Sequence, residues 1–188
     1  MWRFGWLLAL AWACNGGPSY PGDQLVGTYH FAATPVSGSC PYSDVPSGGF
    51  SFDATLSRDS ASGNTWVTIN SVTRDAGFNG QTSVSTLTAP RRFVECDGGD
   101  TQVTETLSFA VLSQSQFAAA GKQCPARPLD GGVPAPDDAG VLLPGLRGGA
   151  WDAVRGCGEL VDALVPDNPD TNKCISCTLT YAVDGTRK

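Results

Sequence analysis

The sequence predicts an all-β fold, either an antiparallel β-sandwich or a small β-barrel, stapled by disulfide bonds. Apolar and polar residues alternate along many short stretches, which is typical of strands that bury one face. Glycine (23 residues) and proline (13 residues) interrupt these stretches at short intervals, as turns require. Beyond residue 14 the chain holds an even number of cysteines, which suits a disulfide framework. We expect roughly seven to nine strands, joined mostly as antiparallel neighbours.

Three strands are expected in the first part of the chain. Each has one apolar and one polar face, so each is expected to be half-buried. The faces expected to be buried are Leu25, Gly27, Tyr29 and Phe31 in the first strand, Phe50, Phe52, Ala54 and Leu56 in the second, and Val67 and Ile69 in the third.

Further strands are expected in the second part of the chain. Residues 82–94 are expected to give one or two strands, and residues 175–183 show the cleanest alternation of all. Between them lies a longer strand with one apolar face, which only Glu105 interrupts. The apolar residues of that face are Val103, Leu107, Phe109 and Val111.

Two segments break the alternation. Residues 124–149 contain five prolines among many glycines, which predicts a loop. A loop of this length is unusual in a compact domain, and we expect Cys124 and Cys157 to help fasten it. Residues 151–164 partly fit helical spacing, but their two glycines argue against a stable helix, so we expect a strand or a short mixed element.

The N-terminal segment is typical of an export signal. Arg3 precedes an apolar run over residues 4–13, and Ala11 and Ala13 form an A-x-A pattern just before Cys14. This run of about ten residues is too short for a membrane-spanning helix, which needs about 20. With a cysteine directly after the run, residues 1–17 resemble the precursors of bacterial lipoproteins.

This resemblance implies that a diacylglycerol is attached to the thiol of Cys14 and that the chain is cut just before it. Residues 1–13 are then a signal peptide, residues 14–23 a flexible lipidated tether, and residues 24–188 a single β-rich domain. The implied location is the bacterial cell envelope, anchored to the membrane by lipid. The outer membrane is favoured over the inner one because Asn15, not aspartate, follows the cysteine. Without lipid, we expect a periplasmic or secreted protein.

The remaining cysteines fit an exported chain, since disulfides persist in oxidising compartments. Six cysteines allow 15 connectivities, and the sequence does not choose among them. Cys174 and Cys177 form a C-x-x-C where a strand is expected to begin, and residues three apart on a strand point to opposite faces. Each of these two is therefore expected to bond a different partner. The disulfide candidates are Cys40, Cys96, Cys124, Cys157, Cys174 and Cys177.

The charge balance argues against nucleic acid as a partner. The net charge is −6, and Arg91-Arg92 is the longest basic run before the terminal Arg187-Lys188. Nucleic acids and anionic lipid surfaces require clusters of lysine and arginine, which this sequence lacks.

No residue is assigned a catalytic, metal-binding or cofactor-binding role. His30 is the one histidine of the sequence, and it is expected on the solvent face of the first strand. The sequence has no G-x-S-x-G motif to supply a nucleophile for it. Acidic turns at residues 95–100 and 167–172 lack the full ligand set of a calcium loop, and turn chemistry accounts for them. We therefore expect that the protein is not an enzyme.

Gly27-Thr28-Tyr29 opens the first expected strand, and Arg187 lies at the end of the last. In this respect the chain resembles calycins, the lipocalin-type barrels, which open with a Gly-x-Trp strand and close with a basic residue packed over it. Tyrosine stands here where calycins have tryptophan. The resemblance implies a barrel, and no binding residue is carried over from it.

The expected function is that of an exported, membrane-anchored lipoprotein serving as a non-enzymatic binding or structural module of the envelope. Its partner is an unknown envelope protein or a small ligand. The alternative is a calycin-like carrier that holds a small apolar ligand inside a barrel, and a hydrolase is the third candidate. An apolar cavity of roughly 300 Å³ or more favours the carrier, whereas convergent carboxylates with perturbed pKa values favour the enzyme.

Overall fold

The computed structural model describes residues 20–96, 99–124, 152–169 and 174–188. These residues form eight strands and one short helix. In chain order they are β1 (Gln24–Ser37), β2 (Phe50–Arg58), β3 (Thr65–Ile69), β4 (Val72–Phe78), β5 (Thr82–Arg92), β6 (Asp100–Ser113), α1 (Gln114–Ala119), β7 (Ala153–Pro166) and β8 (Cys177–Arg187).

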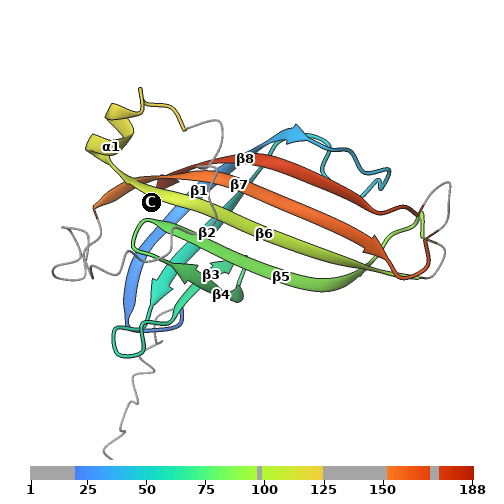
Figure 1. Ribbon diagram of the computed structural model, residues 1–188, viewed down its shortest axis with the longest axis horizontal. Helices are drawn as coiled ribbons and strands as arrows, with labels where there is room; N and C mark the ends of the chain where they lie inside the picture. Colours follow the sequence, from blue (N-terminus) through green and yellow to red (C-terminus); the bar gives the residue numbers. More distant parts are fainter. Residues whose placement is uncertain (1–19, 97–98, 125–151, 170–173) are drawn as a thin grey trace, which may run out of the picture.

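The strands form a closed barrel in which each strand pairs antiparallel with the next. β8 returns to pair with β1, with Tyr29 opposite Arg187, and this pairing closes the ring. The predicted all-β class and antiparallel order are confirmed, and of the two predicted architectures the barrel is the one present. Figure 1 shows that β5 to β8 reach well beyond the short β3 and β4, so one wall of the barrel is taller than the other.

Two regions left open by the sequence are resolved as single strands. Residues 82–94, expected to give one or two strands, contribute β5 alone. Residues 151–164, expected to be a strand or a mixed element, contribute most of β7. The sequence also missed one strand, β4, because only Ala76 and Phe78 among its inward residues are apolar. Its third inward residue is Arg74, so the strand lacks the apolar alternation that marked the others.

The barrel interior is filled by an aromatic core, which consists of Tyr29, Phe31, Phe52 and Phe109. The ring of Phe31 is central, with centroids 5.3 Å from Phe52 in a stacked pair and 5.2 Å from Phe109 in an edge-on pair. Tyr29, Phe31 and Phe109 are each 0 % exposed. Such pairs stabilise a core beyond their buried area, so this part of the interior is packed without a gap for water.

Glycines on the facing strands make room for the ring of Phe31. A Cβ atom at Gly185 on β8 would lie 2.5 Å from Phe31 Cε1, and one at Gly156 on β7 would lie 2.9 Å from Phe31 Cζ. These distances are well inside van der Waals contact, so only glycine allows the ring to lie flat against the β7–β8 wall. Gly156, one of the two glycines that argued against a helix in residues 151–164, thus has a packing role in β7.

The end of the barrel opposite the chain termini is covered by the connection between β1 and β2. Tyr42 in this connection stacks on Phe93, with ring centroids 4.6 Å apart. The hydroxyl of Tyr181, whose ring lines the interior, donates a hydrogen bond of 2.7 Å to the carbonyl oxygen of Pro46. Cys40 is also bonded to Cys177 at the start of β8, so the cover is covalently held in place.

The other end carries α1, which begins with a capping box between Ser113 and Gln116. Its Phe117 ring lies under the guanidinium of Arg155, with 4.7 Å between Cζ and the ring centroid. Among the described residues, no helix has the length and apolar character that crossing a membrane requires.

The expected signal peptide and most of the expected tether lie outside the described residues. The last tether residue, Asp23, accepts a hydrogen bond of 2.8 Å from the backbone N–H of Ser60. The chain is therefore held against the turn between β2 and β3 immediately before β1 begins.

Candidate functional site

The barrel wall is incomplete between β4 and β5. These strands share three register pairs, from Ala76–Ser85 to Phe78–Ser83, whereas β5 and β6 share eleven. The second half of β5 therefore pairs with β6 alone and has no partner on the β4 side. Pro90 lies in this half, as is usual for an edge, since proline cannot donate a ladder hydrogen bond.

Arg74 and Glu105 meet inside the barrel, next to this break in the wall. Arg74 lies on the inward face of β4, and its side chain is 5 % exposed. Its Nη1 atom lies 2.5 Å from Oε1 of Glu105 on β6, so the side chain spans the inner face of β5. The contact is an ion pair rather than an aligned hydrogen bond, and Arg74 Nε has no hydrogen-bond partner among the described atoms.

Asp162 lies directly opposite Glu105 on the neighbouring strand. The two are register partners of β6 and β7, on the face that also carries Leu107 and Leu160 into the core. Burial, and then the nearby Glu105 carboxylate, raise the pKa of Asp162 to about 6, while Arg74 acts in the opposite direction. Asp162 Oδ1 is buried and has no hydrogen-bond partner in the described part of the chain.

Ser85 adds a hydroxyl to the same group. It faces inward on β5, opposite Ala76 of β4 and Leu107 of β6, which makes it a diagonal neighbour of both Arg74 and Glu105. Its side chain is buried, and the described residues supply no hydrogen-bond partner for Oγ. We refer to Arg74, Ser85, Glu105 and Asp162 as the interior polar cluster.

Solvent reaches the barrel interior at the interior polar cluster. Glu105 keeps 30 % of its side chain exposed, although it points inward like Leu107 and Phe109, which are 0 % exposed. Leu87, its register partner on β5 beside the break in the wall, is also only half-buried. The side chains of the aromatic core are therefore closed off from solvent, whereas Glu105 and Leu87 remain partly accessible to it.

The interior polar cluster has unused hydrogen-bonding capacity in both directions. Arg74 Nε can donate, Asp162 Oδ1 can accept, and Ser85 Oγ can do either. An unpartnered buried polar group costs about 1–3 kcal/mol, so each of these atoms favours an incoming partner. Chemically, the cluster can hold the polar head of a small molecule, or it can pair a protonated carboxyl with an ionised one.

The predicted disulfide framework is confirmed. Among the described residues the six candidates pair as Cys40–Cys177, Cys96–Cys174 and Cys124–Cys157. The neighbours Cys174 and Cys177 bond different partners, as their strand geometry predicts. The third bond joins the two cysteines that flank the proline-rich segment, most of which lies outside the described residues.

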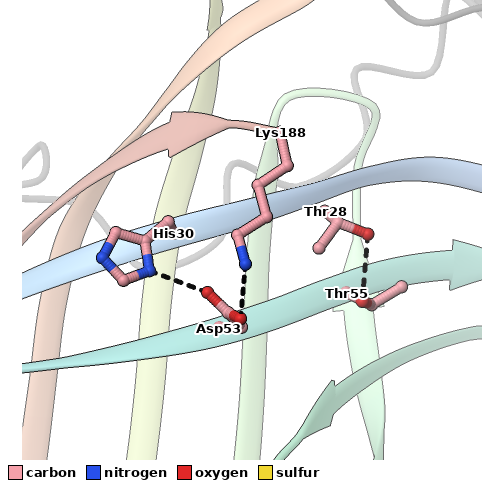
Figure 2. Close-up of polar contacts among 5 residues, drawn as sticks. All are labelled: Thr28, His30, Asp53, Thr55 and Lys188. Atoms are coloured by element: carbon pink, nitrogen blue, oxygen red, sulfur yellow. Dashed lines mark hydrogen bonds and ion pairs between the residues drawn. The ribbon is translucent and has the colours of Figure 1, made fainter.

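His30 lies on the outer face of the barrel, as predicted, and takes part in a small charged network (Figure 2). Its Nδ1 atom lies 2.8 Å from Oδ1 of Asp53, whose Oδ2 is 2.6 Å from Nζ of Lys188. The hydrogen bonds from Lys188 and then from His30 hold the pKa of Asp53 below its usual range. Figure 2 shows Thr28 and Thr55 paired with each other beside this network, and within the described chain no hydroxyl or thiol bonds Nε2 of His30. The network lacks an activated nucleophile.

The described residues of the first acidic turn, residues 95–100, are engaged in local contacts, whereas residues 170–172 of the second turn lie outside the described residues. Glu95 accepts a hydrogen bond of 2.8 Å from the backbone N–H of Ser43, and Asp100 pairs with Arg92 at 2.9 Å. Cys124, Cys157 and Asp184 also lie close enough together to suggest a metal site. The two sulfur atoms are bonded to each other, so neither is the thiolate that a metal requires.

Gly27, Tyr29 and Arg187 lie together at the seam between β1 and β8. Tyr29 faces Arg187 across the β1–β8 seam, and its ring folds back over Gly27, where a Cβ would lie 3.0 Å from Tyr29 Cε2. Burial raises the pKa of Tyr29 to about 12, with Arg187 acting in the opposite direction. The expected lipidation site, Cys14, lies outside the described residues.

Sequence reasoning missed Arg74, Ser85 and Asp162. Glu105 was the available signal, since an acidic residue on an otherwise apolar strand face requires a partner inside the fold. Comparison of the chain with protein-family models, with curated proteins and with solved structures gives no match.

Proposed function

We propose that the protein is an extracytoplasmic binding protein that holds a small molecule against the interior polar cluster. The observation that carries this proposal is the set of buried, unpartnered polar atoms on Arg74, Ser85 and Asp162, at the level where solvent enters the barrel. A ligand that supplies the missing hydrogen bonds removes the cost of leaving these atoms unpartnered. The proposal combines the expected binding module with the carrier alternative.

The ligand enters through the side of the barrel rather than through its end. The end opposite the termini is covered by the β1–β2 connection, which the Cys40–Cys177 bond holds in place. The β4–β5 break leads directly to Leu87 and Glu105. The bound molecule therefore lies beside these two residues, above the sealed aromatic core.

Filling this position tests the proposal. Leu87→Trp places a large ring beside Glu105, and Thr86→Trp is the matched control, because Thr86 is the preceding residue and faces outward. The purified proteins are incubated with an extract of small metabolites, desalted and compared by native mass spectrometry. We expect adducts on the wild type and on Thr86→Trp, with at least a tenfold loss on Leu87→Trp. Equal adducts on all three proteins would place the ligand elsewhere and refute the proposal.

The cellular location of the protein is the second part of the proposal. Three disulfides favour an oxidising compartment, which agrees with export. We propose that lipid on Cys14 anchors the barrel to the bacterial envelope, at the outer membrane. Cells labelled with a fatty-acid analogue are expected to label the wild type and not Cys14→Ala, and equal labelling of both would refute lipidation at this residue.

A hydrolase is a second candidate, because Glu105 and Asp162 form a carboxyl pair with different environments. Asp162 has a raised pKa and suits a proton donor, whereas Glu105 lies against the guanidinium of Arg74. Pairs of this kind carry out glycoside hydrolysis. A panel of 4-nitrophenyl glycosides tests this candidate: it requires turnover by the wild type that both Asp162→Asn and Glu105→Gln abolish.

A further inference from the structure

The charges of the interior polar cluster do not balance among themselves. The interior polar cluster contains two carboxyl groups, Glu105 and Asp162, and one guanidinium, Arg74. Arg74 reaches Glu105 and leaves Oδ1 of Asp162 without a partner. Arg91 on β5 also acts on Asp162, but it is exposed and lies over the ring of Phe93, 5.9 Å from the centroid. A single positive charge beside Asp162 would balance the charges of the interior polar cluster.

The surroundings of the carboxyl pair are apolar. Leu87 on β5 and Leu179 on β8 are the register neighbours of Glu105 and Asp162, so the row across these four strands has a leucine at each end. Such a row buries a hydrocarbon body while its centre binds a charged head. A bare metal ion fits less well, since calcium takes six to eight oxygen ligands and Arg74 repels a cation at the Glu105 side.

We propose that the interior polar cluster binds a small organic cation, a primary ammonium group on an apolar body, with Asp162 and Glu105 as its counter-charges. This inference rests on the proposed binding function and names the ligand class for the same site. An ammonium group has three N–H donors. Asp162, Glu105 and Ser85 supply three acceptors on neighbouring inward positions, and Arg74 is a positioning residue that orients the Glu105 carboxylate.

Acidification weakens this binding. The groups that face Asp162 are Glu105 on β6, Arg74 on β4, Arg91 on β5 and, on β8, Tyr181, whose pKa is raised by burial and then by Asp162. With its pKa raised to about 6, Asp162 is ionised at pH 7.5 and mostly neutral at pH 5. Neutral Asp162 loses its charge–charge attraction for an ammonium group, whereas an uncharged ligand has no such attraction to lose.

Three probes with the same phenylethyl body and different heads test the proposal: 2-phenylethylamine, 2-phenylethanol and 3-phenylpropanoate, titrated into the protein by calorimetry. We expect the amine to bind about tenfold or more tightly than the alcohol, and the carboxylate to bind weakest, since a charge-assisted hydrogen bond is about twice as strong as a neutral one. The amine's affinity is expected to fall about tenfold between pH 7.5 and pH 5, and the alcohol's to stay within about twofold.

Asp162→Asn keeps the shape of the site and removes its charge. We expect this variant to bind the amine and the alcohol within about threefold of each other and to lose the pH dependence, because one charge-assisted bond is gone. Asp75→Asn is the matched control, since Asp75 is an exposed acid next to Arg74 in sequence that faces outward, and it is expected to bind like the wild type.

The outcomes separate this inference from the binding function on which it rests. If the alcohol or the carboxylate binds as tightly as the amine and Leu87→Trp abolishes that binding, the ligand class is wrong and the binding function stands. If the amine binds the wild type and Leu87→Trp equally, the site is elsewhere and both proposals are overturned. A near-native far-UV circular dichroism spectrum for each variant shows that lost binding does not reflect unfolding.

Discussion

Two regions share the interior of this barrel and follow opposite rules. The aromatic core has side chains that are 0 % exposed and interlock through edge-on and stacked ring pairs. The interior polar cluster lies on the same inward faces, yet it has a partly exposed carboxylate and a buried ion pair. The change occurs along single strands, since β6 carries both Phe109 and Glu105.

The two regions are expected to contribute differently to the stability of the barrel. Packed rings supply the favourable burial that holds the eight strands together. The polar cluster subtracts from that stability, because it removes charges from water without fully pairing them. A fold retains such a region at a net cost, and function is the usual reason. Substitutions in the two regions are therefore expected to act differently.

The largest expected effect comes from emptying the aromatic core. Phe31→Ala removes the ring that contacts Phe52 and Phe109, and we expect the free energy of unfolding to fall by about 3–5 kcal/mol. Leu87→Ala, beside the interior polar cluster, is expected to cost about 1 kcal/mol or less, since this side chain is only half-buried. Urea denaturation of both variants measures the contrast, and equal losses would mean that the two regions are packed alike.

A smaller loss is expected from crowding the ring of Phe31. Gly185→Ala places a Cβ atom 2.5 Å from Phe31 Cε1, and overpacking of this kind costs about 1–3 kcal/mol. Gly77→Ala on β4 is the matched control, because its Cβ would have no neighbour within 4 Å. We expect that control to stay within about 0.5 kcal/mol of the wild type. Thermal melts of the two variants give the comparison, and a stable Gly185→Ala protein would show that the core can adjust.

The contribution of the interior polar cluster to stability is expected to depend on pH rather than on side-chain volume. Because its folded pKa is raised to about 6 from 3.8, Asp162 binds its proton more tightly in the folded state. Its contribution to stability is therefore full below pH 4 and is lost as the pH rises through 6. Compared with Asp162→Asn, the wild type is expected to lose stability between pH 4 and pH 7. The difference between their denaturation midpoints at each pH isolates this residue, and a constant difference would contradict the raised pKa.

The smallest effect is expected on the outer face. His30 and Lys188 are both about half exposed, and their contacts with Asp53 are screened by water. We expect His30→Ala and Lys188→Ala to melt at the wild-type temperature within the error of calorimetry. A clear loss in Lys188→Ala would show that this network, rather than backbone pairing alone, helps to hold the end of β8 against the barrel.

The sequence predicted those strands along which apolar and polar residues alternate regularly. Alternation identified β1, β2 and β6 because most of their inward positions are apolar, and the even number of cysteines predicted a disulfide framework without its pairing. β4 escaped because Arg74 occupies an inward position. Its burial depends on Glu105, which lies 31 residues further along the chain.

The candidate site could be predicted only in outline. Glu105 interrupts an apolar face and thereby indicates that an unusual group lies inside the fold. Neither Asp162 nor Ser85 differs from an ordinary surface residue in its local sequence. Both become site residues through strand register, which sets Asp162 opposite Glu105 and Ser85 diagonal to it. Register between distant strands is a property of the whole ring, and no local pattern contains it.

The closure of β8 onto β1 brings both ends of the described chain to the same end of the barrel. The backbone N–H of Lys188 bonds the carbonyl oxygen of Thr28 at 2.9 Å, and the two disulfides of Cys40 and Cys96 lie at the opposite end. A barrel held by its N-terminal segment therefore points its cysteine-bound cap away from the attachment point. A fluorophore or affinity handle added after Lys188 would lie at the end of the barrel opposite the disulfide-held β1–β2 connection.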